Sequence, residues 1–253
     1  MLGLGNILTK GGALLGFPNK YSFSFDGSND YLDIENNSAL SFGTNAHTIS
    51  AWAKIDALAN YKTIISKRQA GGTATDYNLS VGANGVVYTY NGSATAQTAT
   101  GVISAGSWYH YALVYSGSAY QLYINGSAVA WASGTTTSGA SNSHDIGIGW
   151  DRSGNYWDGL IDEVAIWDTA LDATAIAKIG SKVVDLTKHS ASNLKLWIRS
   201  GDKVLPEEDT SIARSDFYTA FDGGSEVVSI SNNVAPTEAI TVSAWVNFTS
   251  LED

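Results

Sequence analysis

The chain has 253 residues, of which 15% are charged and 11% aromatic, and its formal net charge is −10 with no cysteine. The acidic balance offers no basic patch to neutralise phosphates, so we expect no nucleic-acid partner. The absence of cysteine excludes a disulfide framework, and no apolar run is long enough for a membrane span. Plentiful glycine (26) and scarce proline (3) favour many short strands joined by tight turns.

The first twenty residues precede the first strand-like pattern. Their leucines suggest a signal peptide, but no basic segment comes before them, and Lys10 and several glycines interrupt the apolar run. We therefore predict an N-terminal arm, residues 1–20, that docks on a neighbouring protein. A terminus without a role is the alternative.

Alternating apolar and polar residues then predict a series of short strands. Asn84-Gly85 and Asn91-Gly92 are flanked by strand-like residues, which is typical of hairpin turns. In the first half of the chain the predicted strands are 21–25, 31–35, 48–55, 61–67 and 77–81.

The second half continues the pattern and ends in a short helix predicted at 172–179. We expect the last two strands to form a hairpin around a loop from Asp151 to Asp158. Strands at roughly ten-residue spacing with turn pairs between them indicate a two-sheet sandwich. The predicted strands here are 108–115, 120–124, 127–131, 144–150 and 159–167.

The last of these strands carries two acids. Strict alternation places Asp162 on one face and Glu163 on the other. The face of Asp162 is predicted to be the core side, because its other members are the aliphatic residues Leu160, Val164 and Ile166. A buried carboxylate beside aliphatic side chains needs a cation or several hydrogen-bond donors.

The chain contains an internal repeat. Phe25-Asp26-Gly27 recurs 196 residues later at 221–223, and Ser50-Ala51-Trp52 recurs 193 residues later at 243–245. Asn36-Asn37 also recurs 196 residues later. The predicted organisation is an arm (1–20), a complete domain (21–180), a linker with a lead-in strand (181–215) and the opening strands of an incomplete second repeat (216–253).

These few strands of the second repeat cannot bury a face by themselves. Residues 217–248 are therefore predicted to be completed by the edge of the first domain, by a neighbouring copy or by another protein. The alternative is that the segment stays disordered.

Three motifs occur in a fixed order along the chain. They are F-D-G-S-N-D-Y at 25–31, W-Y-H-Y-A-L-V-Y with L-Y-I-N-G at 108–126, and I-D-E-V with a later A-L at 161–171. In these motifs and their order the chain resembles laminin G-like (concanavalin A-like) domains from about residue 21 to 179. The resemblance implies an all-β, two-sheet jelly-roll sandwich.

The resembled family includes glucanases, whose retaining chemistry needs two carboxylates facing one cleft. No E-x-D-x-x-E pattern is present, and alternation directs Asp162 and Glu163 to opposite faces. The four histidines lack a ligand spacing, His110 is predicted to be a core residue, and no serine lies in a G-x-S-x-G elbow. We therefore expect no catalytic residues and no enzyme.

The resemblance also implies a structural calcium ion, held where the end of the first strand meets the I-D-E-V strand. The matching positions are Asp26, the adjoining Gly27 region and Asp162, whose oxygen atoms suit Ca²⁺. The alternative for Asp26 is that it caps its own turn, as Asp before Gly commonly does.

One loop combines aromatic and charged residues suited to a sugar. Aromatic rings stack on the apolar faces of sugars, while charged groups hydrogen-bond the hydroxyls. Trp157 is instead predicted to seal the end of the sandwich, and Tyr88, Tyr90 and Asp76 are candidates for a shared face. The predicted glycan-binding residues are Trp150, Asp151, Arg152 and Tyr156, and the alternative for Trp150 is that it also seals the end of the sandwich.

The glycine-rich start, M-L-G-L-G-N, leading into F-D-G-S-N-D-Y is similar to structural proteins of marine tailed phages. This resemblance implies a non-enzymatic virion surface protein, such as a capsid fibre, decoration or tail appendage. Its lectin-like domain would bind host-surface glycans or decorate the particle, with other virion proteins or further copies contacted through the N-terminal arm and C-terminal strands. The alternative is a secreted or cell-surface bacterial carbohydrate-binding module.

Overall fold

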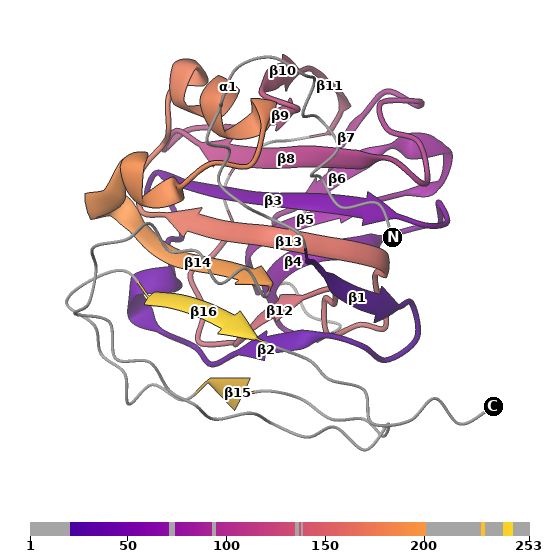
Figure 1. Cartoon of the computed structure of the whole chain (residues 1–253), viewed down its shortest axis with the longest axis horizontal. Coiled ribbons are helices and arrows are strands. Elements are labelled where there is room, and N and C mark those ends of the chain that lie inside the picture. The colour runs from indigo at the N-terminus through magenta and orange to yellow at the C-terminus, as the bar shows by residue number, and fades with distance from the viewer. Residues whose placement is uncertain are drawn as a thin grey trace, which may run out of the picture.

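The computed structural model is an all-β sandwich of two sheets, which confirms the predicted fold class (Figure 1). It describes residues 21–70, 74–92, 95–134, 137, 139–200, 229–230 and 240–244. The predicted N-terminal arm lies outside these residues, as does most of the second repeat. Within the described ranges, no helix combines the length and apolar character that a membrane crossing requires.

Sheet A carries the long central strands, and its strands are antiparallel except for the pairing of its last two members. A short strand, β1 (Phe23–Asp26), pairs with the first part of β13 (Asp158–Trp167). On the same side of β13, β14 (Leu194–Ser200) pairs with the second part of β13. The remaining strands among the described residues lie in the spatial order β10 (Ser127–Val129), β9 (Tyr120–Ile124), β8 (Trp108–Tyr115), β3 (His47–Ile55), β13 (Asp158–Trp167), β14 (Leu194–Ser200) and β16 (Ile240–Ala244).

Sheet B forms the second layer. Its neighbouring strands are antiparallel, except for one parallel pair at its end. Its described strands lie in the order β11 (Trp131–Ser133), β7 (Thr95–Thr98), β6 (Val87–Tyr90), β5 (Thr75–Val81), β4 (Lys62–Arg68), β12 (Ile146–Ile148), β2 (Leu32–Ile34) and β15 (Ser229–Ile230).

The core lies between the sheets and follows the alternation of each strand. On β5, for example, Tyr77, Leu79 and Val81 are fully buried in the core, so the intervening Asn78 and Ser80 point to the outer face of sheet B. Burial of such apolar side chains is the main force that holds the two layers together.

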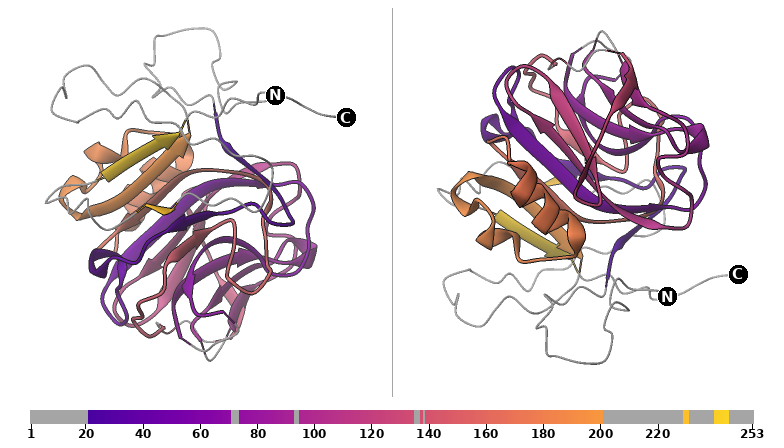
Figure 2. Two further views of the ribbon diagram at one scale, coloured as in Figure 1. Left: turned by 90° about the horizontal axis from the view of Figure 1, so that it is seen from below. Right: turned by 90° about the horizontal axis from the view of Figure 1, so that it is seen from above.

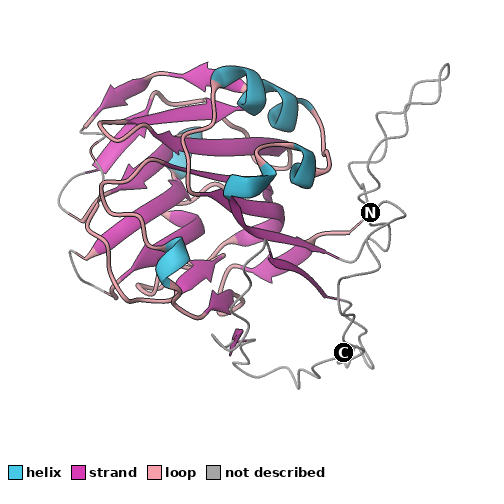
Figure 3. Cartoon of the chain, turned by 90° about the vertical axis from the view of Figure 1, so that its left-hand side faces the viewer, coloured by secondary structure: helices cyan, strands magenta, loops and turns pink. Residues whose placement is uncertain are grey.

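The outer face of sheet A is covered by α1 (Ala173–Ser181) and the segment that follows it (Figure 2). Asp172 caps the helix by accepting the Ala175 N–H at 2.7 Å. Ile176 and Ile179 then pack in a second apolar cluster with Trp167 of β13. The helical segments lie at the periphery of the strands (Figure 3). The short 3-10 helices among the described residues are Ser38–Leu40, Ala83–Gly85, Leu186–Lys188 and Ala191–Asn193.

Two predicted elements differ from the structure because the chain changes sheets. The predicted hairpin of 144–150 with 159–167 was wrong, since β12 belongs to sheet B and β13 to sheet A. The predicted single strand 127–131 is divided between β10 in sheet A and β11 in sheet B. In both places local alternation was correct, but it carries no information about which sheet a strand joins.

A β-bulge in β13 overturns the predicted face of Asp162. The register with β3 shifts between Asp162 and Ala165, and Glu163 adopts a left-handed φ of 52°. Ile161 and Val164 therefore both face the core, while Asp162 pairs with Trp52 on the outer face of sheet A. The prediction that Asp162 shares the core side with Val164 was wrong.

The segment predicted as a lead-in strand to the second repeat lies in the first domain. β14 pairs with β13 from Val164↔Ile198 onward, and its Leu196 and Ile198 enter the core between the sheets. Two short strands of the second repeat then extend the sandwich, with β16 beside β14 and β15 beside β2 (Figure 1).

Candidate functional site

The loop between β12 and β13, residues 149–157, is organised around the Asp151 carboxylate, which is 2% exposed. The backbone N–H groups of Ser153 and Asn155 donate to Oδ1 at 2.9 and 3.3 Å. Oδ2 accepts Asn155 Nδ2 at 2.7 Å and Arg68 Nη1 at 2.8 Å. The chain itself therefore uses both oxygens, and Asp151 shapes the loop from within.

The predicted aromatic residues of this loop come together. The ring of Trp150 lies parallel to that of Tyr156, with centroids 5.9 Å apart, and 4.3 Å from the ring of Tyr31. The Arg152 guanidinium lies 5.1 Å from the Trp150 ring centroid. Trp150, Tyr31 and Tyr156 are all half-buried, so each ring of the cluster keeps part of its surface exposed. Trp157 is fully buried in the core, which confirms its predicted sealing role.

Arg152 is fixed by two acids from other parts of the chain. Its Nη2 donates to Asp33 Oδ1 of β2 and to Asp145 Oδ2 at 3.3 Å. Burial raises the pKa of Asp33, although the adjacent Arg152 guanidinium opposes that rise. The left-handed φ of 64° at Arg152 turns the chain back so that its side chain reaches these acids and Trp150.

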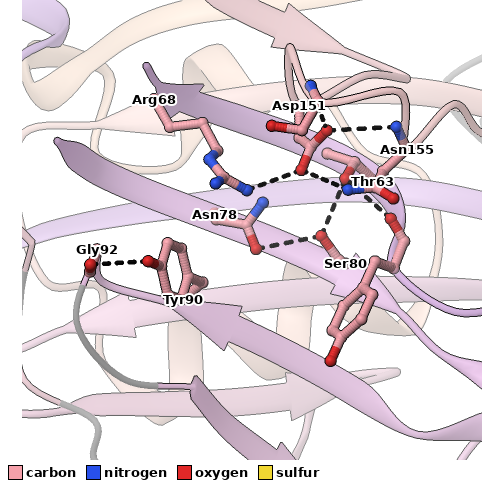
Figure 4. Close-up of polar contacts among 10 residues, drawn as sticks. Thr63, Arg68, Asn78, Ser80, Tyr90, Gly92, Asp151 and Asn155 are labelled. Atoms are coloured by element: carbon pink, nitrogen blue, oxygen red, sulfur yellow. Dashed lines mark hydrogen bonds and ion pairs between the residues drawn. The ribbon is translucent and has the colours of Figure 1, made fainter. Parts of the chain in front are cut away.

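The outer face of sheet B presents a row of hydroxyl and amide groups beside this loop (Figure 4). Thr63 Oγ1 lies 3.1 Å from Ser80 Oγ, which donates to Asn78 Oδ1 at 3.1 Å. Tyr88 and Tyr90 border the row, because they alternate with the core residue Val87. Polar groups and aromatic rings therefore share one sheet face.

Arg68 joins the loop to this face. Its Nη1 binds Asp151 at 2.8 Å, and its guanidinium carbon lies 5.0 Å from the Tyr90 ring centroid (Figure 4). Tyr61 extends the aromatic border, with its ring 5.2 Å from that of Tyr88 and half of its surface exposed.

Two donors in this region lack a partner within the described part of the chain. They are Ser66 Oγ, on a residue 2% exposed, and Arg68 Nε. Ser66 pairs with Asn78 across β4 and β5, so its hydroxyl belongs to the same polar row. Both atoms have almost no accessible surface, so they are suited to an internal water molecule and not to a ligand at the surface.

Residues 26–177, more than half of the chain, match the family model of the concanavalin A-like lectin/glucanases superfamily. The chain belongs to this superfamily. No curated protein sequence matches it.

Solved structures show the same concanavalin A-like fold. Domain 4 of AbnA, an extracellular GH43 arabinanase from Geobacillus stearothermophilus solved with arabinotriose, is 18% identical with a TM-score of 0.50. That match covers 63% of this chain and 76% of the arabinanase domain. A putative carbohydrate-binding protein from Bacteroides ovatus is 19% identical with a TM-score of 0.54, over 70% of this chain and half of its own length. At these identities the likeness shows the fold.

The residues predicted to hold calcium in this concanavalin A-like domain lie apart. Asp26 is opposite Asp158 in the register of β1 with β13, so it lies four residues from Asp162 along β13, roughly 13 Å at a strand's rise per residue. Asp26 Oδ1 accepts the N–H groups of Ser28 and Asn29, which is the turn-capping role given above as the alternative to calcium binding. The Gly27 carbonyl accepts a hydrogen bond from Lys62 Nζ at 3.3 Å.

These residues therefore do not fit a shared ion. Across the described ranges, no three His, Asp or Glu side chains gather in an arrangement suited to a metal. Calcium binding by the chain stays a prediction.

The two acids of β13 are engaged in structural contacts. Because of the bulge, both lie near β14: Asp162 Oδ1 accepts the Ser200 N–H at 2.9 Å, and Glu163 accepts Trp197 Nε1 at 2.6 Å and Arg199 Nε at 3.2 Å. Burial raises the pKa of Glu163, and the neighbouring Asp162 adds to the rise. The prediction that the two side chains point to opposite faces was wrong.

Sequence reasoning missed Tyr31, Tyr61, Ser66 and Arg68. The alternation that identifies Tyr88 and Tyr90 as outward residues also applies to Ser66, whose cross-strand partner is Asn78. For Arg68 and Tyr31 the chain gives no local signal, because their contacts depend on strand pairing and on the fold of the loop. Asp76 accepts the N–H groups of Phe42 and Gly43 and is fully buried, so it supports the fold of that region.

Proposed function

We propose that the chain binds carbohydrate on the outer face of sheet B, between the loop 149–157 and the tyrosine border. The observation that carries the proposal is the polar and aromatic face around Arg68, whose guanidinium binds the loop and stacks on Tyr90, with the half-exposed Tyr61 ring at its border beside Tyr88. A sugar supplies the hydroxyl groups that such polar groups bind and the apolar ring face that tyrosine stacks on.

The related structures support the same class of ligand. The Bacteroides protein is described as a putative carbohydrate-binding protein, and the arabinanase domain was solved with arabinotriose. We carry over the class of ligand from them, without a particular sugar or a particular binding face.

Two exposed tyrosines allow a matched test on the full chain. Tyr61 and Tyr21 are each 50% exposed, but only Tyr61 lies beside the sheet B face, next to Tyr88. On a glycan array, and by calorimetry with the best glycan found, Tyr61→Ala should weaken binding by roughly tenfold, the value of one stacking contact. Tyr21→Ala should leave binding unchanged. Equal affinity of both variants and the parent chain would contradict the proposed face.

The proposed role is adhesion without hydrolysis. Asp162 and Glu163, adjacent acids of β13, are buried and accept hydrogen bonds from β14, which supports a structural use of both carboxylates. Incubation of the full chain with β-glucans and arabinans should release no reducing sugar. Turnover above that of an Asp162→Asn, Glu163→Gln control would overturn this part of the proposal.

The proposed location is the surface of a tailed-phage particle, where the domain would bind host glycans or decorate the shell. This rests on the similarity of the glycine-rich start, M-L-G-L-G-N leading into F-D-G-S-N-D-Y, to structural proteins of tailed phages, which is a sequence feature. A secreted or cell-surface bacterial module is the competing proposal. Immunogold labelling of particles from cells that carry the gene should mark virions. Label confined to the cell surface or to particle-free medium would favour the bacterial module.

A further inference from the structure

The two described strands of the second repeat have counterparts in the first. At the 196-residue offset of the repeat, Ser229–Ile230 (β15) corresponds to Asp33–Ile34 of β2. At the 193-residue offset, Ile240–Ala244 (β16) corresponds to His47–Ala51 of β3. The repeat therefore contributes equivalents of one edge strand and one central strand.

The pairing of these strands differs from the pairing of their counterparts. β3 lies between β8 and β13 and is antiparallel to both, whereas β16 pairs in parallel with β14. β15 pairs in parallel with β2, its own counterpart, with Ser229 opposite Asp33 and Ile230 opposite Ile34. Neither contact belongs to the internal fold of a repeat, so both are contacts between repeats.

The two accepting strands lie on one side of the sandwich. β14 follows β13 at the end of sheet A, β2 follows β12 at the end of sheet B, and the added strands β16 and β15 lie on this same side of the sandwich (Figures 1 and 2). An uncovered edge strand offers free N–H and C=O groups to any other strand, and proteins generally protect such edges. Here the second repeat covers the edges of both sheets.

The accepting strand β14 is held firmly in place by β13. Ser200 N–H donates to Asp162 Oδ1, and Arg199 Nε binds Glu163 Oε1 at 3.2 Å, with both side chains of that ion pair almost fully buried. The acids of the bulge thus fix the last two residues of β14 beside the position where β16 pairs. A fixed strand loses little conformational entropy when another strand adds to it.

We propose that the outer edges of β14 and β2 form a strand-acceptor surface on the concanavalin A-like domain, and that its occupants are β16 and β15 of the same chain. Addition of strands supplies backbone hydrogen bonds, and two strands that enter two sheets fix the added segment against the domain.

A cleavable full-length chain tests this surface. A recognition sequence for a site-specific protease replaces residues 207–213, and the folded protein is cut. Residues 214–253 should remain bound to the domain through gel filtration as a one-to-one complex of monomer mass. Loss of the fragment from the peak would overturn the proposal, and so would a complex of dimer mass, because the segment would then be donated by a second copy.

Two adjacent proline variants provide the matched control. In a strand, neighbouring residues direct their N–H groups to opposite sides, so only one of Val242 and Ser243 directs its N–H group towards β14. One of Val242→Pro and Ser243→Pro should release the cut fragment, while the other retains it. Retention in both variants would show that the fragment is held without β14 pairing and would overturn the proposal.

Discussion

Arg68 on β4 and Asp151 in the loop before β13 form an ion pair with a separation of 2.8 Å, although they are 83 positions apart in the chain. Their side chains are 14% and 3% exposed. Because Arg68 also stacks on Tyr90, the pair connects the aromatic loop to the outer face of sheet B. This ion pair therefore contributes both to the stability of the loop and to the shape of the proposed binding face.

Asp151→Ala should lower the free energy of unfolding by about 3 kcal/mol, because it leaves the Arg68 guanidinium partly buried without its acid. In thermal unfolding this corresponds to a fall in Tm of roughly 6–12 °C for a domain of this size. Asp56→Ala is the control, since Asp56 pairs with Lys54 at the surface, where such pairs contribute less than about 1 kcal/mol. Similar Tm values for the two variants would contradict the role of Asp151.

Alanine substitutions at two glycines of the same loop distinguish the cost of backbone strain from the cost of a side-chain clash. Gly149 and Gly154 have φ values of 76° and 86°, so alanine at either position costs about 1 kcal/mol. A Cβ at Gly149 would lie 2.6 Å from the Phe25 ring, whereas nothing lies within 4 Å at Gly154. Gly149→Ala should therefore destabilise the chain by about 1–3 kcal/mol more than Gly154→Ala in urea unfolding. Equal effects would show that the loop does not press on Phe25.

The sequence predicts the sandwich well because alternation and turn chemistry are local properties. The strands 108–115 and 120–124 match β8 and β9 residue for residue, since both are rich in aromatic and aliphatic residues, pair without a register shift and are followed by turn residues. The face of Asp162 was mispredicted because the bulge uses Glu163, a residue that gives no turn signal, at a left-handed φ. The pairing of β12 with β2 and β4 likewise follows from the fold as a whole.

The candidate site was predicted in part for a similar reason. Trp150, Arg152 and Tyr156 are close in sequence, and the structure brings them into contact. Tyr31 and Arg68 reach the same region from distant strands, so only tertiary structure identifies them.

Acid should destabilise the chain through His47. This fully buried ring binds the Asn45 carbonyl and the Tyr120 hydroxyl, and burial lowers its pKa from 6.5 to about 4. A histidine with a lowered folded pKa stabilises the protein above 6.5, and this contribution is lost as the pH falls towards 4. The loss should be roughly 2–3 kcal/mol.

Unfolding by urea at several pH values between 7 and 4 measures this effect. The pH dependence should be smaller in His47→Gln than in the parent chain, because the variant has no imidazole to protonate in the unfolded state. His144→Gln serves as the control at a less buried histidine. An unchanged pH profile in His47→Gln would assign the acid sensitivity to other groups.

The buried carboxyl group of Glu163 should make the attachment of β14 sensitive to a rise in pH through neutrality. Burial and the adjacent Asp162 raise the pKa of Glu163, and Arg199 opposes the rise. For an acid with a raised folded pKa, the stabilising contribution is present below the unfolded value of 4.5 and is lost as the pH rises through the folded pKa of about 7. Arg199→Met should enlarge this loss, since the carboxylate then ionises beside Asp162 without the guanidinium.

Arg199→Met should therefore destabilise the chain by about 3 kcal/mol at pH 8 and by less at pH 5. Adding Glu163→Gln should recover part of the loss at pH 8, with a coupling energy of about 1–3 kcal/mol in the double-mutant cycle. Lys195→Met is the control on the same strand, because Lys195 pairs with Asp168 in a more exposed setting. Additive effects of the two substitutions at pH 8 would mean that Arg199 stabilises β14 through its packing on Trp197, whose ring centroid lies 5.3 Å from the guanidinium, and not through Glu163.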